Sequence, residues 1–448
     1  TMTHALMFGS VAIDMIPQAM CQVDSDQRDI RRPQGSACDV GAFELTGWGV
    51  AERISDVGDA SSPKVAVDAD GNSLAVWSQD DGLGGYTIWA NRFTPAAGWG
   101  VAERIGTANY YPESAPEVAM DPDGNALAVW SESGSIWADR FMPATGWDVA
   151  VRIGGTGRLN AFDAQVAVDP NGDALAVWTQ YNDVDSPPQI WANRFMAATG
   201  WDVAEPISDA GSVSYPQVAV DPNGNAFAVW AKYTAAGYTI WVNGFTAAAG
   251  WGVDEAIGTG SYPSPAPQVA TDPNGNALAV WIGYNDIGDQ DVWANRFTTV
   301  TGWGVAERIS RAVHYAASPQ VAVDPSGSAL VVWEEWRATG STIAANRYMP
   351  ATGWGAAGRI AIDEASYAYS PMVAIDPSGN AFAAWSQSGS IWVDRFMPDT
   401  GWRAPVPITT GDAGYVYPPQ VAFDADGNAL AVWSQSGSIW VTRFTGNR

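Results

Sequence analysis

Several residue types and patterns are scarce in this sequence of 448 residues, and each scarcity excludes a class of protein. Lys and Arg number 22 against 48 Asp and Glu, and the net charge of −26 argues against nucleic acids and anionic membranes as partners. No apolar run approaches the ~18 residues of a membrane-spanning helix, so we expect no membrane insertion. With only His4 and His314, and no nucleophile elbow, P-loop or His-rich motif, we expect no enzyme, no cofactor and no metal.

Cysteine is also scarce, since Cys21 and Cys38 are the two cysteines of the chain. The spacing of a four-ligand metal site is absent around them. We expect a disulfide between them, which implies an oxidising, extracytoplasmic compartment, and the alternatives are two thiols close by chance or half of a metal site. The chain begins with Thr1, and no basic segment followed by an apolar one comes next, so we expect a processed product or a fragment.

One phrase occurs eight times and first reads PKVAVDADGNSLAVW, at residues 63–77. Its final tryptophan recurs at intervals of 48 to 53 residues. Two further phrases recur with it, such as IWANRF at residues 88–93 and GWGVAERI at residues 47–54. All are rich in β-branched and aromatic residues and are bounded by Gly, Pro, Asp or Asn, which is typical of strands.

A tandem repeat of about 50 residues with four strands predicts an all-β fold, a β-propeller. The sequence indicates eight four-stranded blades over residues 45–448. The eighth copy ends after its third strand, residues 439–444, whereas the repeat region begins with an unpartnered fourth strand, residues 48–54. We expect these two segments to pair and close the propeller, because closure leaves no exposed edge strand that would invite aggregation.

The connections between strands predict two different faces, one with uniform Asp-Pro-Asn-Gly turns and one with loops of variable length. Tyrosine collects on the variable face, with 14 of 15 residues, whereas every tryptophan except Trp336 occupies a repeat position, where it should pack between blades. Tyrosine suits the recognition of a protein or a sugar, and the alternative is that the rings only fill space between blades. The candidate binding residues are Tyr110, Tyr111, Tyr181, Tyr215, Tyr262, Tyr284, Tyr315, Tyr367, Tyr369, Tyr415 and Tyr417.

Two repeated features resemble chemical sites. Turns such as Asp-Ala-Asp-Gly-Asn at residues 68–72 resemble a calcium loop, but they are short and lack the distal Glu, so we interpret them as structural turns. A sialidase would gather three arginines on one carboxylate, whereas arginines spread over the repeats indicate ion pairs between blades. The third-strand arginines are Arg92, Arg140, Arg194, Arg296, Arg347, Arg395 and Arg443, and Gly244 replaces the arginine of the fourth copy.

The first 44 residues do not share the repeat. The stretches GSVAID at residues 9–14 and DQRDIRRPQGSACDVGAFE at residues 26–44 resemble the C-terminal end of secreted, surface-anchored bacterial proteins with a right-handed parallel β-helix. Asp29 stands where that pattern has glycine. We interpret residues 1–44 as an assembly arm that packs on its own propeller or inserts into another copy, which would build a homo-oligomer, a ring or a filament.

The repeats, with GNALAVW followed by IWANRF and GWGVAERI, resemble a widespread set of bacterial secreted or surface propeller proteins over residues 47–444. The resemblance implies the fold and an extracellular or cell-surface location, and little about activity. We therefore expect a non-catalytic extracellular propeller subunit with a structural or adhesive role. A lectin-like module that binds glycans is the second hypothesis. A glycosidase, which would need clustered carboxylates or arginines at the funnel mouth, is the third.

Overall fold

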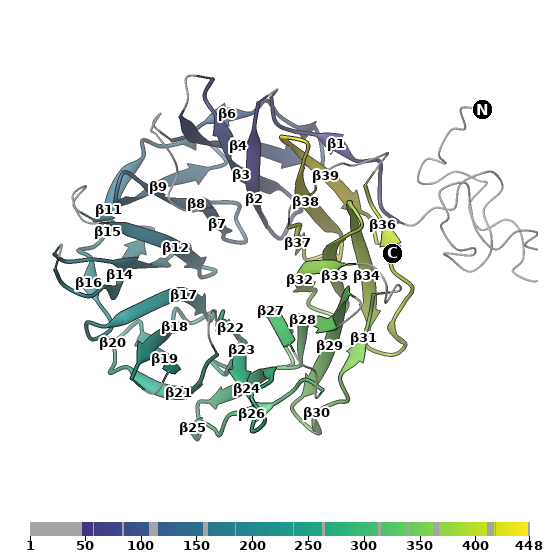
Figure 1. Ribbon diagram of the computed structural model, residues 1–448. Coiled ribbons are helices and arrows are strands. Elements are labelled where there is room, and N and C mark those ends of the chain that lie inside the picture. The colour runs from purple at the N-terminus through teal and green to yellow at the C-terminus, as the bar shows by residue number, and fades with distance from the viewer. Residues whose placement is uncertain are drawn as a thin grey trace, which may run out of the picture.

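The computed structural model describes residues 47–446 except 57, 83–84, 107–114, 156–159, 184, 236, 262–264, 312–314, 338–339, 362–366, 410–415 and 417. The described residues contain no helix and form antiparallel sheets that follow one another around a circle (Figure 1). The protein is therefore all-β, with a β-propeller type of fold. Cys21, Cys38 and the rest of residues 1–44 lie outside the described residues, so the disulfide and the assembly arm stay predictions.

Each repeat contributes an inner strand and a second strand joined by a tight turn. The inner strands are β2 (Ala60–Val67), β7 (Glu117–Met120), β12 (Ala161–Val168), β17 (Ser212–Val220), β22 (Gln268–Thr271), β27 (Tyr315–Val323), β32 (Ala368–Ile375) and β37 (Gln420–Phe423). The second strands are β3 (Ser73–Asp80), β8 (Ala126–Glu132), β13 (Ala174–Gln180), β18 (Ala226–Thr234), β23 (Ala277–Tyr284), β28 (Ala329–Arg337), β33 (Ala381–Gln387) and β38 (Ala429–Gln435). The second strand is buried on both faces, because other units cover it on either side.

The third strand of each repeat pairs with the second strand on one side and with the outer strands on the other. The third strands are β4 (Tyr86–Thr94), β9 (Ser135–Met142), β14 (Gln189–Met196), β19 (Gly237–Thr246), β24 (Gln290–Thr298), β29 (Gly340–Met349), β34 (Ser390–Met397) and β39 (Ser438–Phe444). Gln290 of β24 also pairs in parallel with Tyr315 of β27, which joins the fifth and sixth repeats in one sheet.

The outer strand differs from the prediction, since two short pieces replace one continuous strand. The first pieces are β5 (Gly98–Trp99), β10 (Gly146–Trp147), β15 (Gly200–Trp201), β20 (Gly250–Trp251), β25 (Gly302–Trp303), β30 (Gly353–Trp354) and β35 (Gly401–Trp402). The second pieces are β1 (Glu52–Arg53), β6 (Glu103–Arg104), β11 (Val151–Gly155), β16 (Glu205–Pro206), β21 (Glu255–Thr259), β26 (Glu307–Arg308), β31 (Gly358–Arg359) and β36 (Val406–Pro407). The Asn91 side chain donates to Gly100 O between two such pieces, at 3.3 Å, and interrupts the ladder there.

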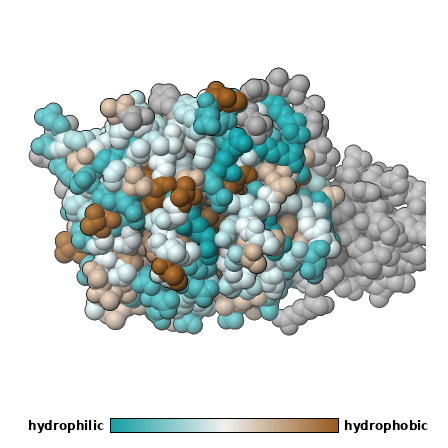
Figure 2. All heavy atoms as spheres, turned by 90° about the horizontal axis from the view of Figure 1, so that it is seen from below, coloured by the Kyte–Doolittle hydropathy of each residue, from teal (hydrophilic) through white to brown (hydrophobic). Residues whose placement is uncertain are grey.

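A valine beside this interruption is exposed on the rim of the molecule in six repeats. Val101, for example, is 88% exposed, and its equivalents are Val50, Val149, Val203, Val253 and Val305. In the edge-on view of Figure 2, hydrophobic side chains are scattered among hydrophilic ones. Exposed apolar residues that stand singly are normal on protein surfaces, so the rim does not mark a binding site.

The hydrophobic core is divided among the interfaces between successive units. Between the eighth and first repeats, Trp77 packs in one cluster with Leu430 and Ile439. The second-strand tryptophans are at most 1% exposed, and they are Trp77, Trp130, Trp178, Trp230, Trp281, Trp333, Trp385 and Trp433. These tryptophans are therefore part of the frame.

The two ends of the repeat region lie in the same sheet. Glu52 of β1 pairs with Val441 of β39, and Trp48 forms a bridge with Phe444. The inner strand β37 contacts β2, just as the other inner strands contact the next one along the chain. Residues from both ends thus complete one four-stranded unit, in the order β1-β39-β38-β37.

Five of the inner strands, β2, β12, β17, β27 and β32, have a bulge near the variable face. In β27 the register shifts between Ala317 and Gln320, and Ser318 has a φ of 49°. A positive φ occurs at the equivalent residue of six repeats, namely Ser62, Asp163, Tyr215, Ala266, Ser318 and Ser370. Because a bulge bends its strand and re-aims the neighbouring side chains, it orients the residues that lead into the inner strands, including Tyr315.

A third-strand asparagine ties most units to the preceding one. Asn91 Nδ2 donates to Ile54 O at 3.1 Å, and the same bond is made by Asn193, Asn243, Asn295 and Asn346. Asp139 and Asp394 take this position in two other repeats. Burial raises the pKa of Asp139 to about 7 and the pKa of Asp394 to about 8, because it disfavours the ionised carboxylate. At mildly acidic pH both side chains therefore carry a proton that they can donate, as asparagine does.

Candidate functional site

The aspartates of the uniform turns use their carboxylate oxygens within the turn. Asp68 Oδ1 accepts from Asp70 N and Asn72 N, at 2.9 and 2.8 Å, and its Oδ2 accepts from Asn72 Nδ2 at 2.7 Å. Across the described part of the chain, no group of three or more His, Cys, Asp or Glu side chains could hold a metal ion. The geometry of these turns is that of structural turns rather than calcium loops.

The third-strand arginines hold neighbouring repeats together, but not by the predicted ion pairs. Arg92 lies 5.2 Å from the centre of the Phe141 ring in the next repeat, and Arg443 lies 5.2 Å from the Phe93 ring. Equivalent contacts at 4.9–5.5 Å are made by Arg140, Arg194, Arg296, Arg347 and Arg395. The ion pairs that do form, Arg194 with Asp173 at 3.3 Å and Arg443 with Asp424 at 3.4 Å, lie within one repeat. The prediction of ion pairs between blades is wrong because an aromatic ring faces each arginine across the interface.

Six of the eleven candidate tyrosines fall within the described residues. Tyr215, Tyr284, Tyr315 and Tyr367 are exposed, and Tyr181 and Tyr369 are half-buried. The other candidates lie outside the described residues, and they are Tyr110, Tyr111, Tyr262, Tyr415 and Tyr417. Of the six, Tyr315 and Tyr367 are brought together, on either side of Trp336.

An exposed aromatic cluster of Tyr315, Trp336 and Tyr367 lies where the sixth repeat meets the seventh. Tyr315 pairs with Trp336 across β27 and β28, and the Trp336 ring lies 6.1 Å from the Tyr315 ring and 6.2 Å from the Tyr367 ring. Trp336 also pairs with Ser341 of β29, which forms a parallel bridge with Tyr367. The three rings thus follow one row of backbone pairing, and they are 40%, 37% and 58% exposed, in the order Tyr315, Trp336, Tyr367.

A buried carboxylate, Glu334, holds the Trp336 ring in place. Glu334 is 5% exposed, and its Oε2 accepts from Trp336 Nε1 at 2.9 Å. Its Oε1 accepts from Ser370 N of the seventh repeat at 2.7 Å. Hydrogen bonds to a charged acceptor are stronger than neutral ones, so both the ring and the repeat junction are fixed by the same side chain. The indole therefore keeps its orientation while 37% of the residue stays exposed to solvent.

The residues after Glu334 alternate across the sheet, so Glu335 lies on the opposite side from the aromatic cluster. Arg359 Nε lies 3.3 Å from Glu335 Oε2, and Arg337 Nη2 lies 3.8 Å from Glu335 Oε1. Arg311 Nε donates to Ala357 O at 2.6 Å, beside the strand that carries Arg359. These arginines contact the sixth repeat on the side of β28 opposite to the aromatic cluster. Glu334 and Glu335 thus face different sides of β28 and do not form the paired carboxylates of a glycosidase.

The sequence analysis selected Tyr315 and Tyr367 but missed Trp336 and Glu334. The signal was present, because Trp336 is the tryptophan that breaks the repeat pattern. Glu334 also breaks it, since the equivalent residues are Ser78, Ser131, Thr179, Ala231, Ile282, Ser386 and Ser434. Departures from a structural repeat are therefore a better guide to this site than tyrosine content alone.

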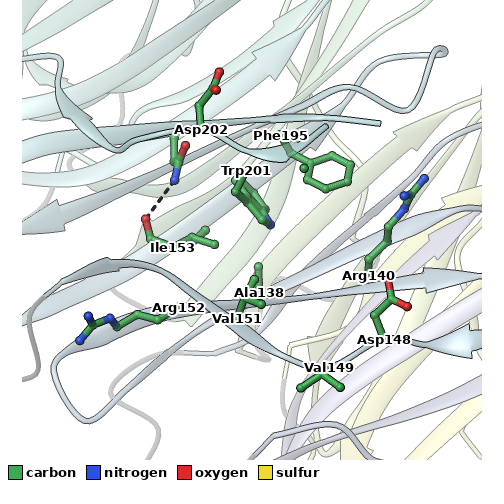
Figure 3. Close-up of a pocket in the computed structure, with 12 residues that line it drawn as sticks. Ala138, Arg140, Asp148, Val149, Val151, Arg152, Ile153, Phe195, Trp201 and Asp202 are labelled. Atoms are coloured by element: carbon green, nitrogen blue, oxygen red, sulfur yellow. Dashed lines mark hydrogen bonds between the residues drawn. The ribbon is translucent and has the colours of Figure 1, made fainter. Parts of the chain in front are cut away.

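A pocket of about 490 Å³ lies between the outer strands of the second and third repeats (Figure 3). Trp201, Arg140 and Asp148 line it, and Asn193 Nδ2 donates to Ile153 O in its wall. The Trp201 ring packs on the Phe195 ring at 5.3 Å, as the equivalent rings of other repeats do. The pocket is thus built from frame residues and is a weaker candidate than the aromatic cluster.

No protein-family profile and no curated protein sequence matches the chain. Among solved structures, a puromycin hydrolase is 15% identical with a TM-score of 0.49, and the match covers 85% of this chain. The chain spans 59% of the length of that hydrolase. A polysaccharide lyase, an ulvan lyase bound to -[GlcA(1-4)Rha3S]-, is 7% identical with a TM-score of 0.50, and 77% of this chain and 94% of the lyase are covered. The similarity to the ulvan lyase supports a β-propeller type of fold.

The comparisons also correct the expectation of a non-catalytic structural or adhesive subunit. The ulvan lyase of similar fold is an enzyme, so the expectation that the chain is no enzyme is contradicted together with the structural role. Both expectations were based on the regular repeats and the scarcity of histidine, and these features describe the frame rather than its loops. At such low identity the similarity concerns the fold, and the reaction has to be sought in this chain's own residues. Among the described residues, no helix is long and apolar enough to cross a membrane.

Proposed function

We propose that this chain is a closed propeller of eight blades and a carbohydrate-active protein that binds a polysaccharide at the Tyr315–Trp336–Tyr367 cluster. Three kinds of contact that join successive repeats also join the eighth repeat to the first, and they support the closed ring. Strand β37 contacts β2, and Arg443 lies over the Phe93 ring. In addition, a Cβ added to Gly71 would lie 2.9 Å from Asp424 Oδ2.

The observation that carries the binding function is the exposed, oriented ring of Trp336. A ring that only filled space between blades would be buried, as Trp333 is at 1% exposure three residues earlier. Trp336 instead leaves 37% of its surface open, although Glu334 fixes its indole nitrogen. A rigid ring binds at a smaller cost in conformational entropy than a mobile one, so this arrangement is suited to a ligand.

The chemistry of the cluster favours a sugar. A sugar ring has an apolar C–H face and a rim of hydroxyls, and Trp and Tyr offer an apolar face with a polar tip. The net charge of −26 opposes binding of nucleic acids, the other common ligands that stack on aromatic rings. The ulvan lyase of similar fold is bound to a saccharide, so a fold of this type accommodates the ligand class. The location outside the cell and the assembly role of residues 1–44 stay predictions from the sequence.

Affinity electrophoresis in gels that contain single polysaccharides tests the proposal. The panel includes neutral chains (xylan, glucomannan, β-glucan) and acidic chains (alginate, pectin, ulvan), and released reducing ends and unsaturated products are assayed on the same panel. We expect retardation by at least one polysaccharide, its loss in Trp336→Ala, and its retention in Val203→Ala, which changes an exposed rim valine. Free migration of the wild type in every gel, or unchanged retardation of Trp336→Ala, would overturn the proposal.

A further inference from the structure

The residue three positions after the buried second-strand tryptophan is aromatic in four consecutive repeats. These residues are Tyr181, Tyr233, Tyr284 and Trp336, in the third to the sixth repeats. The other repeats carry Asp80, Ser133, Ser388 and Ser436 at the same position. Because equivalent residues have the same place in each unit, the backbone positions of the four residues follow the adjacent sheets that contain β13, β18, β23 and β28 (Figure 1).

Three of the four rings are presented in the same way. Tyr233, Tyr284 and Trp336 lie in their second strands an odd number of residues after the tryptophan, so their side chains leave the strand on the side opposite to it, whereas Tyr181 directly follows the end of β13. Tyr233 and Tyr284 are 52% and 45% exposed, comparable with Trp336. Tyr181 is half-buried and packs on the Phe162 ring at 6.2 Å, with an angle of 33° between the planes. The arc is therefore a surface of spaced rings rather than one compact patch.

The spacing of the arc indicates what covers it. Packed sheets lie about 10 Å apart, which is roughly the length of a disaccharide unit in an extended chain. We propose that the arc of Tyr181, Tyr233, Tyr284 and Trp336 is a track for one uncharged, linear polysaccharide, with one aromatic ring for every two sugar units. This inference rests on the proposed function and deepens it, because it makes the ligand the interior of a long chain rather than a chain end.

The charges along the arc favour an uncharged chain. Asp183, Asp185 and Asp286 are exposed in the loops that follow Tyr181 and Tyr284. Carboxylates accept hydrogen bonds from sugar hydroxyls but repel uronates and sulfates. The arginines of the sixth repeat do not offset this repulsion, since Arg337 and Arg359 lie against Glu335 on the other side of β28. A neutral polysaccharide therefore meets both stacking surfaces and hydrogen-bond acceptors.

Calorimetric titration with oligosaccharides of increasing length tests the track, using the neutral polymer that retards the wild type most in the gels. The probes are its disaccharide, tetrasaccharide, hexasaccharide and octasaccharide, with polygalacturonate as the charged comparison. Affinity should rise roughly fivefold with each added pair of sugars and level off at the octasaccharide. Tyr233→Ala should remove part of this rise, whereas Tyr233→Phe, which keeps the ring, should retain most of it and Val253→Ala should resemble the wild type.

The outcomes separate this inference from the function on which it rests. If oligosaccharides bind in a Trp336-dependent way but affinity does not grow with length, or Tyr233→Ala has no effect, the track is refuted and the proposed function stands. If neither the polymers nor the oligosaccharides bind, the proposed function itself fails. Tighter binding of polygalacturonate than of every neutral chain would overturn the assignment of an uncharged ligand. Circular dichroism of each variant confirms that it is folded.

Discussion

Replacing Asp139 and Asp394 by asparagine is expected to stabilise the protein at alkaline pH and to have a much smaller effect at about pH 5. Five repeats place an asparagine at this position, and its amide donates to a carbonyl of the preceding repeat. An ionised aspartate has no proton to donate and is buried as a charge. The pKa values of about 7 and about 8 reflect this burial, which outweighs the backbone N–H groups and the Arg403 charge that favour ionised Asp394.

The direction of the pH dependence follows from proton binding. Below about pH 4 both carboxyls are protonated in the folded and unfolded chains. Between about pH 4 and the raised pKa values, the folded chain holds protons that the unfolded chain has lost, so the free energy of unfolding falls as the pH rises. Above about pH 8 both states are ionised and the contribution no longer changes. The stabilising contribution of the two protonated carboxyls is therefore fully present below about pH 4. It is lost progressively as the pH rises from there to the raised pKa values of about 7 and about 8.

The size of the effect can be worked out from the pKa of Asp139. The gap between 3.8 and about 7 corresponds to about 4 kcal/mol for a fully desolvated group. Asp148, whose charge also raises this pKa, lines the open pocket of Figure 3, so solvent screening reduces the figure. We expect a gain of about 2 kcal/mol for each asparagine substitution at about pH 9, and roughly a third of that at about pH 5.

Urea unfolding followed by tryptophan fluorescence at the two pH values measures this difference. Asn346→Asp is the matched control, since it creates the same aspartate in the sixth repeat and should destabilise the protein more at about pH 9 than at about pH 5. Equal shifts at both pH values would refute the reasoning, because they would show that the two aspartates do not change protonation. A loss of stability in the asparagine variants at about pH 9 would refute it as well.

Two further pairs of substitutions test the frame. Gly124→Ala should lower the free energy of unfolding by about 3 kcal/mol. Gly124 has a φ of 82°, and an added Cβ would lie 2.8 Å from Asp68 Oδ2, which is held by a hydrogen bond from Asn72 Nδ2. Gly146→Ala, with the same φ but no other described atom within 4 Å, should cost only about 1 kcal/mol in the same urea assay. Trp333→Ala should cost about 4 kcal/mol of unfolding free energy, while the exposed Trp336→Ala should cost about 1 kcal/mol, and equal losses would contradict the division between frame and site.

Sequence reasoning was most successful where a local pattern recurs. The Asp-x-x-Gly turns and the buried tryptophans depend on residues that are close together in the chain, and each pattern occurs eight times. The all-β class follows from the same short repeated strand patterns. Features that depend on the neighbouring unit were harder to predict. The ring that faces Arg92 is Phe141, and nothing near Arg92 in the sequence distinguishes a ring from a carboxylate across the interface. The break in the outer strand likewise depends on a side chain, Asn91, inserted from the third strand.

The site was predicted in part for the same reason. Composition ranked the eleven tyrosines equally, and only the arrangement of the sixth and seventh repeats brings Tyr315 and Tyr367 to Trp336. The bridge between Ser341 and Tyr367 joins different units, so the sequence within one repeat cannot reveal it. Glu334 was overlooked because a single glutamate has no motif, and its role depends on Ser370 of the next repeat.

Glu334 and Trp336 break the repeat together, and restoring the residues of other repeats tests whether the frame needs them. In Glu334→Ser/Trp336→Ser we expect the free energy of unfolding to stay within about 1 kcal/mol of the wild type, because removing a buried carboxylate together with its indole donor offsets the loss of the acceptor of Ser370 N. Trp336→Ser alone should be less stable than the double variant, since it leaves Glu334 Oε2 without that donor. Polysaccharide retardation should be lost in both.

The comparison of the single and double variants separates a structural role from a binding role. If the pair served the frame, the double variant would be the least stable of the series, with a loss of about 3 kcal/mol or more. If the pair serves a ligand, binding disappears while the stability of the double variant is kept, as in the seven repeats that lack a carboxylate at this position. A buried carboxylate that holds an exposed ring in place is then explained by what that ring binds.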